Sequence, residues 1–284
     1  MKYFSSFKNF SSKKSLFFLI LICHTAFSQT PEERGVIMKE YDLIKLQNIE
    51  EGFYKTTYEQ KEKAIKLAKK NGWKLKYTDS KGSKYELMKL TKDGSPIYFK
   101  THNLDAAVST RANFLHNNGG LGLNVEGKEM TVHVWDEGIA RATHQEYDGD
   151  GGFDRFSVGD GTTELDFHGA HVMGTIISSG IDSRAKGMAP KAKGVGYDWN
   201  NVESEAAAAA ANGMLLSNHS YGFAVRNDAG EPQLPAYYFG AYTDYAKDWD
   251  NILYNAPYYL MVTSAGNDGN DNSANAAPLE GNSS

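Results

Sequence analysis

Residues 168–175 read HGAHVMGT, and this stretch decides how the rest of the chain is interpreted. The stretch begins with a histidine and contains Gly169 and Gly174. Val172 and the two isoleucines that follow the stretch, Ile176 and Ile177, have helical spacing. The spacing predicts a helix over residues 168–178. The two glycines would let that helix lie close to neighbouring backbone. An imidazole at the start of such a helix is suited to proton transfer, because histidine titrates near neutral pH.

Strands and helices alternate on both sides of this helix. Strands are predicted at residues 131–135, 194–197, 214–217 and 259–264, and further helices at residues 202–212 and 237–254. This alternation predicts an α/β fold in which a parallel sheet is flanked by helices. Reactive groups gather at the carboxyl ends of the strands in such sheets. Asp136 and Asn267 each follow one of these strands, so we expect both to approach His168.

Four segments resemble, in sequence and in order, the subtilisin-like serine proteases (subtilases, peptidase family S8). They are residues 132–138 (VHVWDEG), 168–175, 187–190 (GMAP) and 264–267 (SAGN). The family pattern around the catalytic histidine is H-G-T-H-V-A-G-T, so Ala170 replaces a usual threonine. The resemblance covers about residues 110–284 and implies a serine endopeptidase that acts on polypeptide substrates.

The resemblance also implies catalytic roles for three residues. His168 would be the general base that takes the proton of a serine hydroxyl. Asp136 would accept a hydrogen bond from the other ring nitrogen and fix the tautomer. Asn267 would donate its side-chain amide to the oxyanion of the tetrahedral intermediate. This chemistry requires no cofactor.

Simpler interpretations remain open for the same residues. A histidine at a helix start is often a capping or surface residue, and Asn267 in a Gly-Asn-Asp-Gly sequence can be a turn residue. His171 is expected to pack in the core. A metal site on His168 and His171 lacks a third ligand at a familiar spacing.

The segment Ser220-Tyr221-Gly222 follows an apolar strand and resembles the S-[LM]-G segment of the family. In the family this segment binds the substrate backbone as an added strand, which lets one protease accept many sequences. A plain strand end is the alternative interpretation.

Two further features depart from the family pattern. Glu137 stands where serine or threonine usually follows the catalytic aspartate, and we expect it to point to solvent, since a second carboxylate nearby would raise the pKa of Asp136. The nucleophile motif G-T-S-[MA] is absent from residues 268–284. We therefore expect the chain to be the N-terminal portion of such a protease, with the aspartate and the histidine but not the serine.

Residues 29–110 are predicted to form a separate, small α+β module. A helix is expected at residues 58–71, followed by strands at 73–77, 85–90 and 96–100 with turns at 81–82 and 93–94. This module has 16 basic and 12 acidic residues, whereas residues 111–284 have 10 basic and 23 acidic residues. The opposite net charges and the small core suggest a module that docks on the rest of the chain. The resemblance implies a pro-domain, and an unrelated N-terminal domain is the alternative.

Residues 1–28 have the pattern of a cleavable signal peptide, with four lysines, an apolar stretch and Ala26-Phe27-Ser28 at the cleavage site. The sequence therefore predicts a secreted protein. The apolar stretch is too short to span a bilayer comfortably, so no stable membrane insertion is expected. Cys23 is the single cysteine, so we expect no disulfide in the mature chain. The alternative interpretation is a lipoprotein that is lipidated at Cys23. The acidic main part argues against nucleic acid as a partner.

Residues 148–154 read DGDGGFD, so Asp148, Asp150 and Asp154 are candidates for a structural Ca²⁺ site. The loop lacks the bidentate glutamate of an EF-hand, and a flexible acidic loop is the alternative.

Three functions remain at this point: a secreted serine endopeptidase, a non-catalytic binding or inhibitory module on the subtilase scaffold, and a metal-dependent hydrolase.

Overall fold

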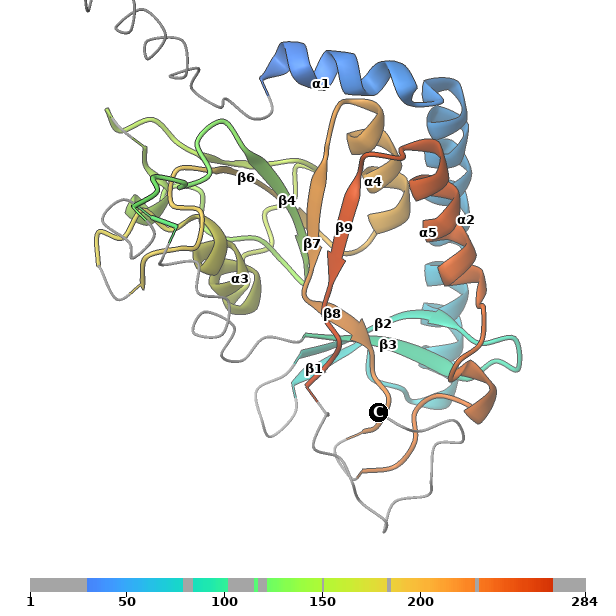
Figure 1. The fold of residues 1–284 in the computed structure, drawn as a ribbon. Coiled ribbons are helices and arrows are strands. Elements are labelled where there is room, and N and C mark those ends of the chain that lie inside the picture. Colours follow the sequence, from blue (N-terminus) through green and yellow to red (C-terminus); the bar gives the residue numbers. More distant parts are fainter. Residues whose placement is uncertain are drawn as a thin grey trace, which may run out of the picture.

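The structure is a computed structural model that describes residues 30–78, 84–101, 115–116, 122–149, 151–182, 185–227 and 230–267. Its centre is a sheet in the order β5-β6-β4-β7-β9, in which all neighbouring strands are parallel (Figure 1). The strands are β4 (Thr131–Asp136), β5 (Phe156–Val158), β6 (Lys193–Asp198), β7 (Leu216–His219) and β9 (Leu260–Thr263). The predicted parallel α/β sheet is confirmed.

Helices cover both faces of this sheet. Helix α3 (Phe167–Ile177) packs on one face, where Val132 and Val134 of β4 meet Val172 and Met173. Helices α4 (Val202–Ala211) and α5 (Asp244–Asn255) cover the other face, where Trp135 lies in the same apolar cluster as the alanines of α4 (Figure 1). The alternation of inward and outward side chains along β4 thus fills two separate cores.

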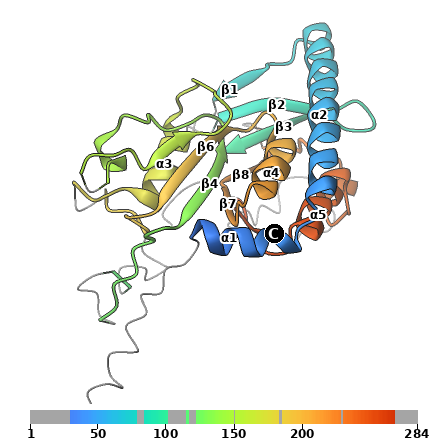
Figure 2. The ribbon, with the colours of Figure 1, turned by 90° about the horizontal axis from the view of Figure 1, so that it is seen from above.

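The first described part, residues 30–101, is called the front segment below. It contains α1 (Pro31–Ile37), the short helix η2 (Met38–Glu40), α2 (Leu43–Asn71), β1 (Lys76–Thr78), β2 (Lys84–Leu90) and β3 (Pro96–Thr101). Two further 3₁₀ turns, η4 (Gln145–Tyr147) and η6 (Ala236–Tyr238), belong to the rest of the chain. Helix α1 lies across the end of the parallel sheet at which β4 and β7 begin (Figures 1 and 2).

Helix α2 is much longer than predicted, because it starts at Leu43 rather than near residue 58. The Asp42 side chain accepts a hydrogen bond from the Lys45 N–H, which caps the first turn, and Gly72 ends the helix at a φ of 72°. Leu46 in the added turns is fully buried. The short side chains of the alanine-rich α4 let α2 pack closely against it.

The front segment shares its core with the parallel-sheet part. Strands β1, β2 and β3 form an antiparallel sheet, to which β8 (Tyr221–Phe223) adds beside β3. Phe99 of β3 packs against Trp199 and Tyr221. The Trp199 indole N–H donates to Glu86 over 2.8 Å. Buried contacts therefore join the two parts, although they are far apart in sequence.

Among the described residues, no helix combines the length and the apolar character needed to cross a bilayer. The predicted signal peptide at residues 1–28, with Cys23, lies outside the described residues. So do the predicted turn at residues 81–82 and most of the stretch between the front segment and β4.

Candidate active site

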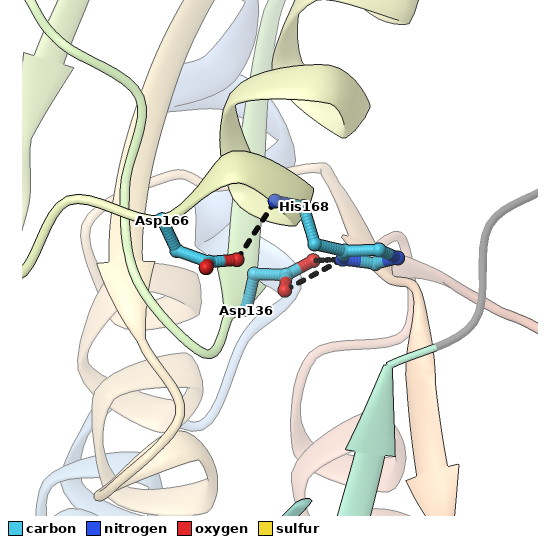
Figure 3. Close-up of side chains that lie close together, drawn as sticks. All are labelled: Asp136, Asp166 and His168. Carbon is cyan, nitrogen blue, oxygen red and sulfur yellow. Dashed lines mark hydrogen bonds and ion pairs between the residues drawn. The ribbon is translucent and has the colours of Figure 1, made fainter. Parts of the chain in front are cut away.

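Asp136 and His168 come together at the carboxyl end of β4. Asp136 is the last residue of that strand, and His168 is the second residue of α3. The Nδ1 atom of His168 lies 2.8 and 2.9 Å from the two carboxylate oxygens of Asp136 (Figure 3). The sequence prediction that these two distant residues approach each other agrees with this geometry.

The pair is buried, which affects its protonation. Asp136 is only 1% exposed. Burial raises the pKa of Asp136, the hydrogen bond with His168 opposes the rise, and the nearby charge of Asp166 adds to it. When the carboxylate is ionised it accepts the Nδ1 proton, so the neutral imidazole keeps its lone pair on Nε2, which points away from Asp136 (Figure 3). This arrangement can remove a proton from a group placed beside Nε2.

Asp166 is a site residue that the sequence interpretation missed. It is the N-cap of α3, and its side chain accepts hydrogen bonds from the backbone N–H groups of His168, at 2.8 Å, and Gly169. Its backbone N–H donates to the carbonyl of Ile139, in the loop after β4. An aspartate two residues before the helical pattern was the signal that could have identified it. Asp166 therefore ties the start of α3 to the loop beside Asp136.

Removal of the Asp166 cap is expected to destabilise the fold. We expect Asp166→Ala to lower the free energy of unfolding by about 1 kcal/mol, the usual cost of losing an N-cap acceptor. Asp166→Asn keeps the acceptor and should cost only a few tenths of a kcal/mol. Urea denaturation of both variants measures the difference. An equal loss in both would mean that the charge of Asp166, and not its capping bond, stabilises the helix.

Glycines allow the close approach that brings the pair together. A Cβ atom added to Gly169 would lie 2.0 Å from the carbonyl oxygen of Gly138. The loop that follows β4 also pairs with the segment before α3, because the Ile139 N–H donates to the Glu164 carbonyl over 2.8 Å. The glycine after the histidine is thus required by backbone contact.

The structure places Asn267 beyond β9, on an exposed stretch. Strand β9 is parallel to β7, so its carboxyl end lies at the same edge of the sheet as the end of β4. Among the described residues, no hydrogen bond joins Asn267 to His168 or Asp136. The oxyanion role of Asn267 therefore stays a prediction.

The predicted substrate-binding segment is engaged within the chain. Ser220 lies between β7 and β8, and Tyr221 and Gly222 belong to β8. Tyr221 pairs with Thr101, and Gly222 with Lys100, so β3 of the front segment lies antiparallel along this strand. The edge of β8 that was predicted to bind a substrate backbone is therefore paired with the backbone of β3.

Two expectations about neighbouring residues were wrong. His171 is exposed rather than packed in the core, because it lies on the opposite side of α3 from Gly169, Val172 and Met173. Glu137 does not point fully to solvent, since its Oε2 atom is buried. Its charge acts on Lys76 of the front segment, which offsets the cost of placing a second carboxylate here.

The possible metal ligands that lie together in the structure are not the pair considered from the sequence. Potential ligand atoms of Asp136, Asp166 and His168 lie within 4.8 Å of one another, so a cation site would include Asp166 rather than His171. Of the predicted calcium loop, Asp148 and Asp154 form an antiparallel bridge. Asp150 lies outside the described residues, so the calcium prediction is untested.

Comparison with protein-family models gives a match to the subtilase family (Peptidase_S8) over residues 127–283. This match covers more than half of the chain and includes the buried pair, the segment 220–222 that was predicted to bind substrate, and Asn267. The comparisons with curated proteins and with solved structures found no match. With its parallel sheet and the Asp136–His168 pair at the strand end, the chain belongs to the subtilase family.

Proposed function

We propose that this chain is the N-terminal portion of a secreted serine endopeptidase, with a front segment that acts as its pro-domain. His168 is the general base, Asp136 orients its ring and stabilises the imidazolium, and Asn267 contributes to the oxyanion hole. The substrates are polypeptides. The proposal requires a serine nucleophile that residues 268–284 do not offer, because no serine there stands in the family's G-T-S-[MA] motif.

The observation that carries the proposal is the hydrogen-bonded pair. A carboxylate that is 1% exposed and accepts from His168 Nδ1 over 2.8 Å fixes one tautomer and one ring orientation. Membership of the subtilase family supplies the reaction class, which is acyl transfer to a serine hydroxyl.

The pro-domain role of the front segment is supported by the pairing of β3 with β8. Three register pairs, from Phe99↔Phe223 to Thr101↔Tyr221, occupy the backbone groups that would bind a substrate strand. A substrate and the front segment would therefore compete for the same edge. The front segment would keep the protease inactive until it is removed.

The test compares this chain with a longer product of the same reading frame. The 284-residue chain should not react with a fluorophosphonate probe, because none of its serines stands in a G-T-S-[MA] motif. A version extended through an in-frame G-T-S-[MA] motif should be labelled, and His168→Ala should abolish the labelling. Glu59→Ala, on the exposed side of α2, is the matched control and should leave the labelling unchanged.

Two results would contradict the proposal. A reading frame that stops without the serine motif would favour a non-catalytic binding or inhibitory module. Hydrolysis that a chelator abolishes, without labelling by the probe, would favour a metal-dependent hydrolase on the Asp136, Asp166 and His168 group.

A further inference from the structure

A second concave site lies on the α4 side of the parallel sheet. Its volume is about 390 Å³. Thr131, the first residue of β4, and Leu215, just before β7, line it, whereas Asp136 stands at the opposite end of β4. The length of β4 separates the two ends by about 16 Å, at about 3.3 Å per residue. The cavity is therefore distinct from the candidate active site, and nothing in the proposed protease mechanism uses it.

The walls of the cavity combine both charges with aromatic and apolar surface. Arg34 of α1 supplies a guanidinium, and Glu205 of α4 supplies a carboxylate. The rings of His133 and Tyr197, which stack with centroids 5.7 Å apart, form part of the wall. Apolar surface comes from Ala208, Ala209, Met214 and Leu215. Such a mixture suits a small molecule with separate charged ends and an apolar part.

The Glu205 carboxylate has room for a cationic partner. Its Oε2 atom accepts the indole N–H of Trp135 over 2.9 Å, and no hydrogen bond from the described residues reaches its Oε1 atom. Burial raises the pKa of Glu205 to about 7; the Trp135 bond opposes the rise, and the charges of Asp160 and Asp198 add to it. A partly buried carboxylate among other acids is stabilised in its charged form by a bound ammonium.

Arg34 is the complementary charge for an anionic group. Burial and then the Arg34 charge lower the pKa of His133 to about 4, so this ring is neutral at neutral pH. The Nδ1 atom of His133 is hydrogen-bonded to the Tyr197 hydroxyl at 3.1 Å, which holds the ring in place. A guanidinium binds carboxylates through charge-assisted hydrogen bonds.

We propose that this cavity binds a short peptide zwitterion, a free amino acid or a dipeptide, with its ammonium on Glu205 and its carboxylate on Arg34. The apolar side chain of the ligand packs against Ala208, Ala209 and Met214. Arg34 belongs to the front segment, and α1 lies across this end of the sheet (Figure 2). The site is therefore complete only while the front segment is docked.

The test uses a matched series of ligands on the unaltered chain. Alanyl-leucine, its C-terminal amide and its N-acetyl derivative are titrated by isothermal calorimetry. Alanyl-leucine should bind, and each capped form should bind about tenfold more weakly, since each loses one charge-assisted contact. Equal binding of the amide would overturn the proposal in favour of a simple cation site, and no binding of alanyl-leucine would overturn it altogether.

Variants assign the contacts. Glu205→Gln keeps an acceptor for Trp135 but removes the charge, and Arg34→Gln removes the guanidinium; each should reduce binding of alanyl-leucine about tenfold. Ala208→Leu should reduce binding by filling the cavity without changing a charge. Glu32→Gln, exposed on α1, is the control and should bind as the unaltered chain does. Unchanged binding in Glu205→Gln or Arg34→Gln would overturn the assignment.

Discussion

Replacing Glu86 by alanine is expected to lower the free energy of unfolding by about 3 kcal/mol, because it breaks a buried ionic cluster. The Glu86 side chain is 6% exposed and accepts from Lys61 Nζ over 2.7 Å and from the Trp199 indole N–H over 2.8 Å. Its loss leaves the indole N–H without its acceptor, and leaves the Lys61 charge with only the long contacts to Asn200 Oδ1, at 3.5 Å, and Met88 Sδ, at 3.4 Å. Lys76, 53% exposed, contributes little to the total. Urea denaturation measures the effect, and exposed Glu59→Ala should change stability by less than about 0.5 kcal/mol.

The same cluster sets a pH dependence. Burial raises the pKa of Glu86, but Lys61, Trp199 and Lys76 together outweigh it and hold the pKa below 4.5. A folded-state pKa below the unfolded value means that the stabilisation is complete above about pH 4.5 and is lost as the pH falls through the folded value. The difference in stability between the unaltered chain and Glu86→Gln should therefore shrink only below about pH 4.5. A difference that already disappeared near pH 6 would contradict this assignment.

Replacing Gly169 by alanine is expected to separate Asp136 from His168. The new Cβ atom would lie 2.0 Å from the Gly138 carbonyl oxygen, a contact with backbone that no side-chain rotation relieves. The start of α3 must then move, at a cost of about 3 kcal/mol in stability, the upper part of the usual range for overpacking. Because His168 is the preceding residue, its Nδ1 atom should move away from Asp136.

Two measurements check this result. The proton shared by His168 and Asp136 should give a low-field NMR signal in the unaltered chain that is lost in Gly169→Ala. Gly52→Ala is the matched control, because nothing lies within 4 Å of its added Cβ in α2. It should be neutral or stabilising by about 0.5–1 kcal/mol, as expected for alanine inside a helix. A retained signal in Gly169→Ala would contradict the prediction, because it would show that the loop after β4 moves to accommodate the added Cβ atom.

Local patterns predicted the centre of the fold well. The strand expected at residues 131–135 is β4 at Thr131–Asp136, and the helix expected at residues 168–178 is α3 at Phe167–Ile177. Both have strong apolar periodicity, which is the most reliable signal in a single sequence. Their ends placed Asp136 and His168 correctly at one edge of the sheet.

Elements with weak local signals were misplaced. The strand expected at 214–217 lies at Leu216–His219, and the helix expected at 237–254 is reduced to a 3₁₀ turn and α5 from Asp244. The first half of α2 has little helical signal, with Gly52 in its interior, and depends on packing of buried Leu46. Strand β5 was not predicted at all. Tertiary contacts decide these elements, and a single sequence does not contain them explicitly.

The contacts of the front segment were the part least accessible from sequence. The opposite charges predicted docking, but not that β3 would pair with β8 or that Glu86 would receive the Trp199 indole. Each of these contacts joins residues more than a hundred positions apart. Neither has a motif, so only the structure reveals them.

The pairing of β3 with β8 has a consequence for how the chain reaches its native state. Strands β1 to β3 pair with near neighbours, whereas β4 pairs with β6 and β7, which lie much further along the chain. Contacts between residues near in sequence form sooner. We therefore expect the first hairpins to be ready before the parallel sheet can assemble. The open edge of β3 would then pair with residues 221–223 and set the register from which the remaining strands align.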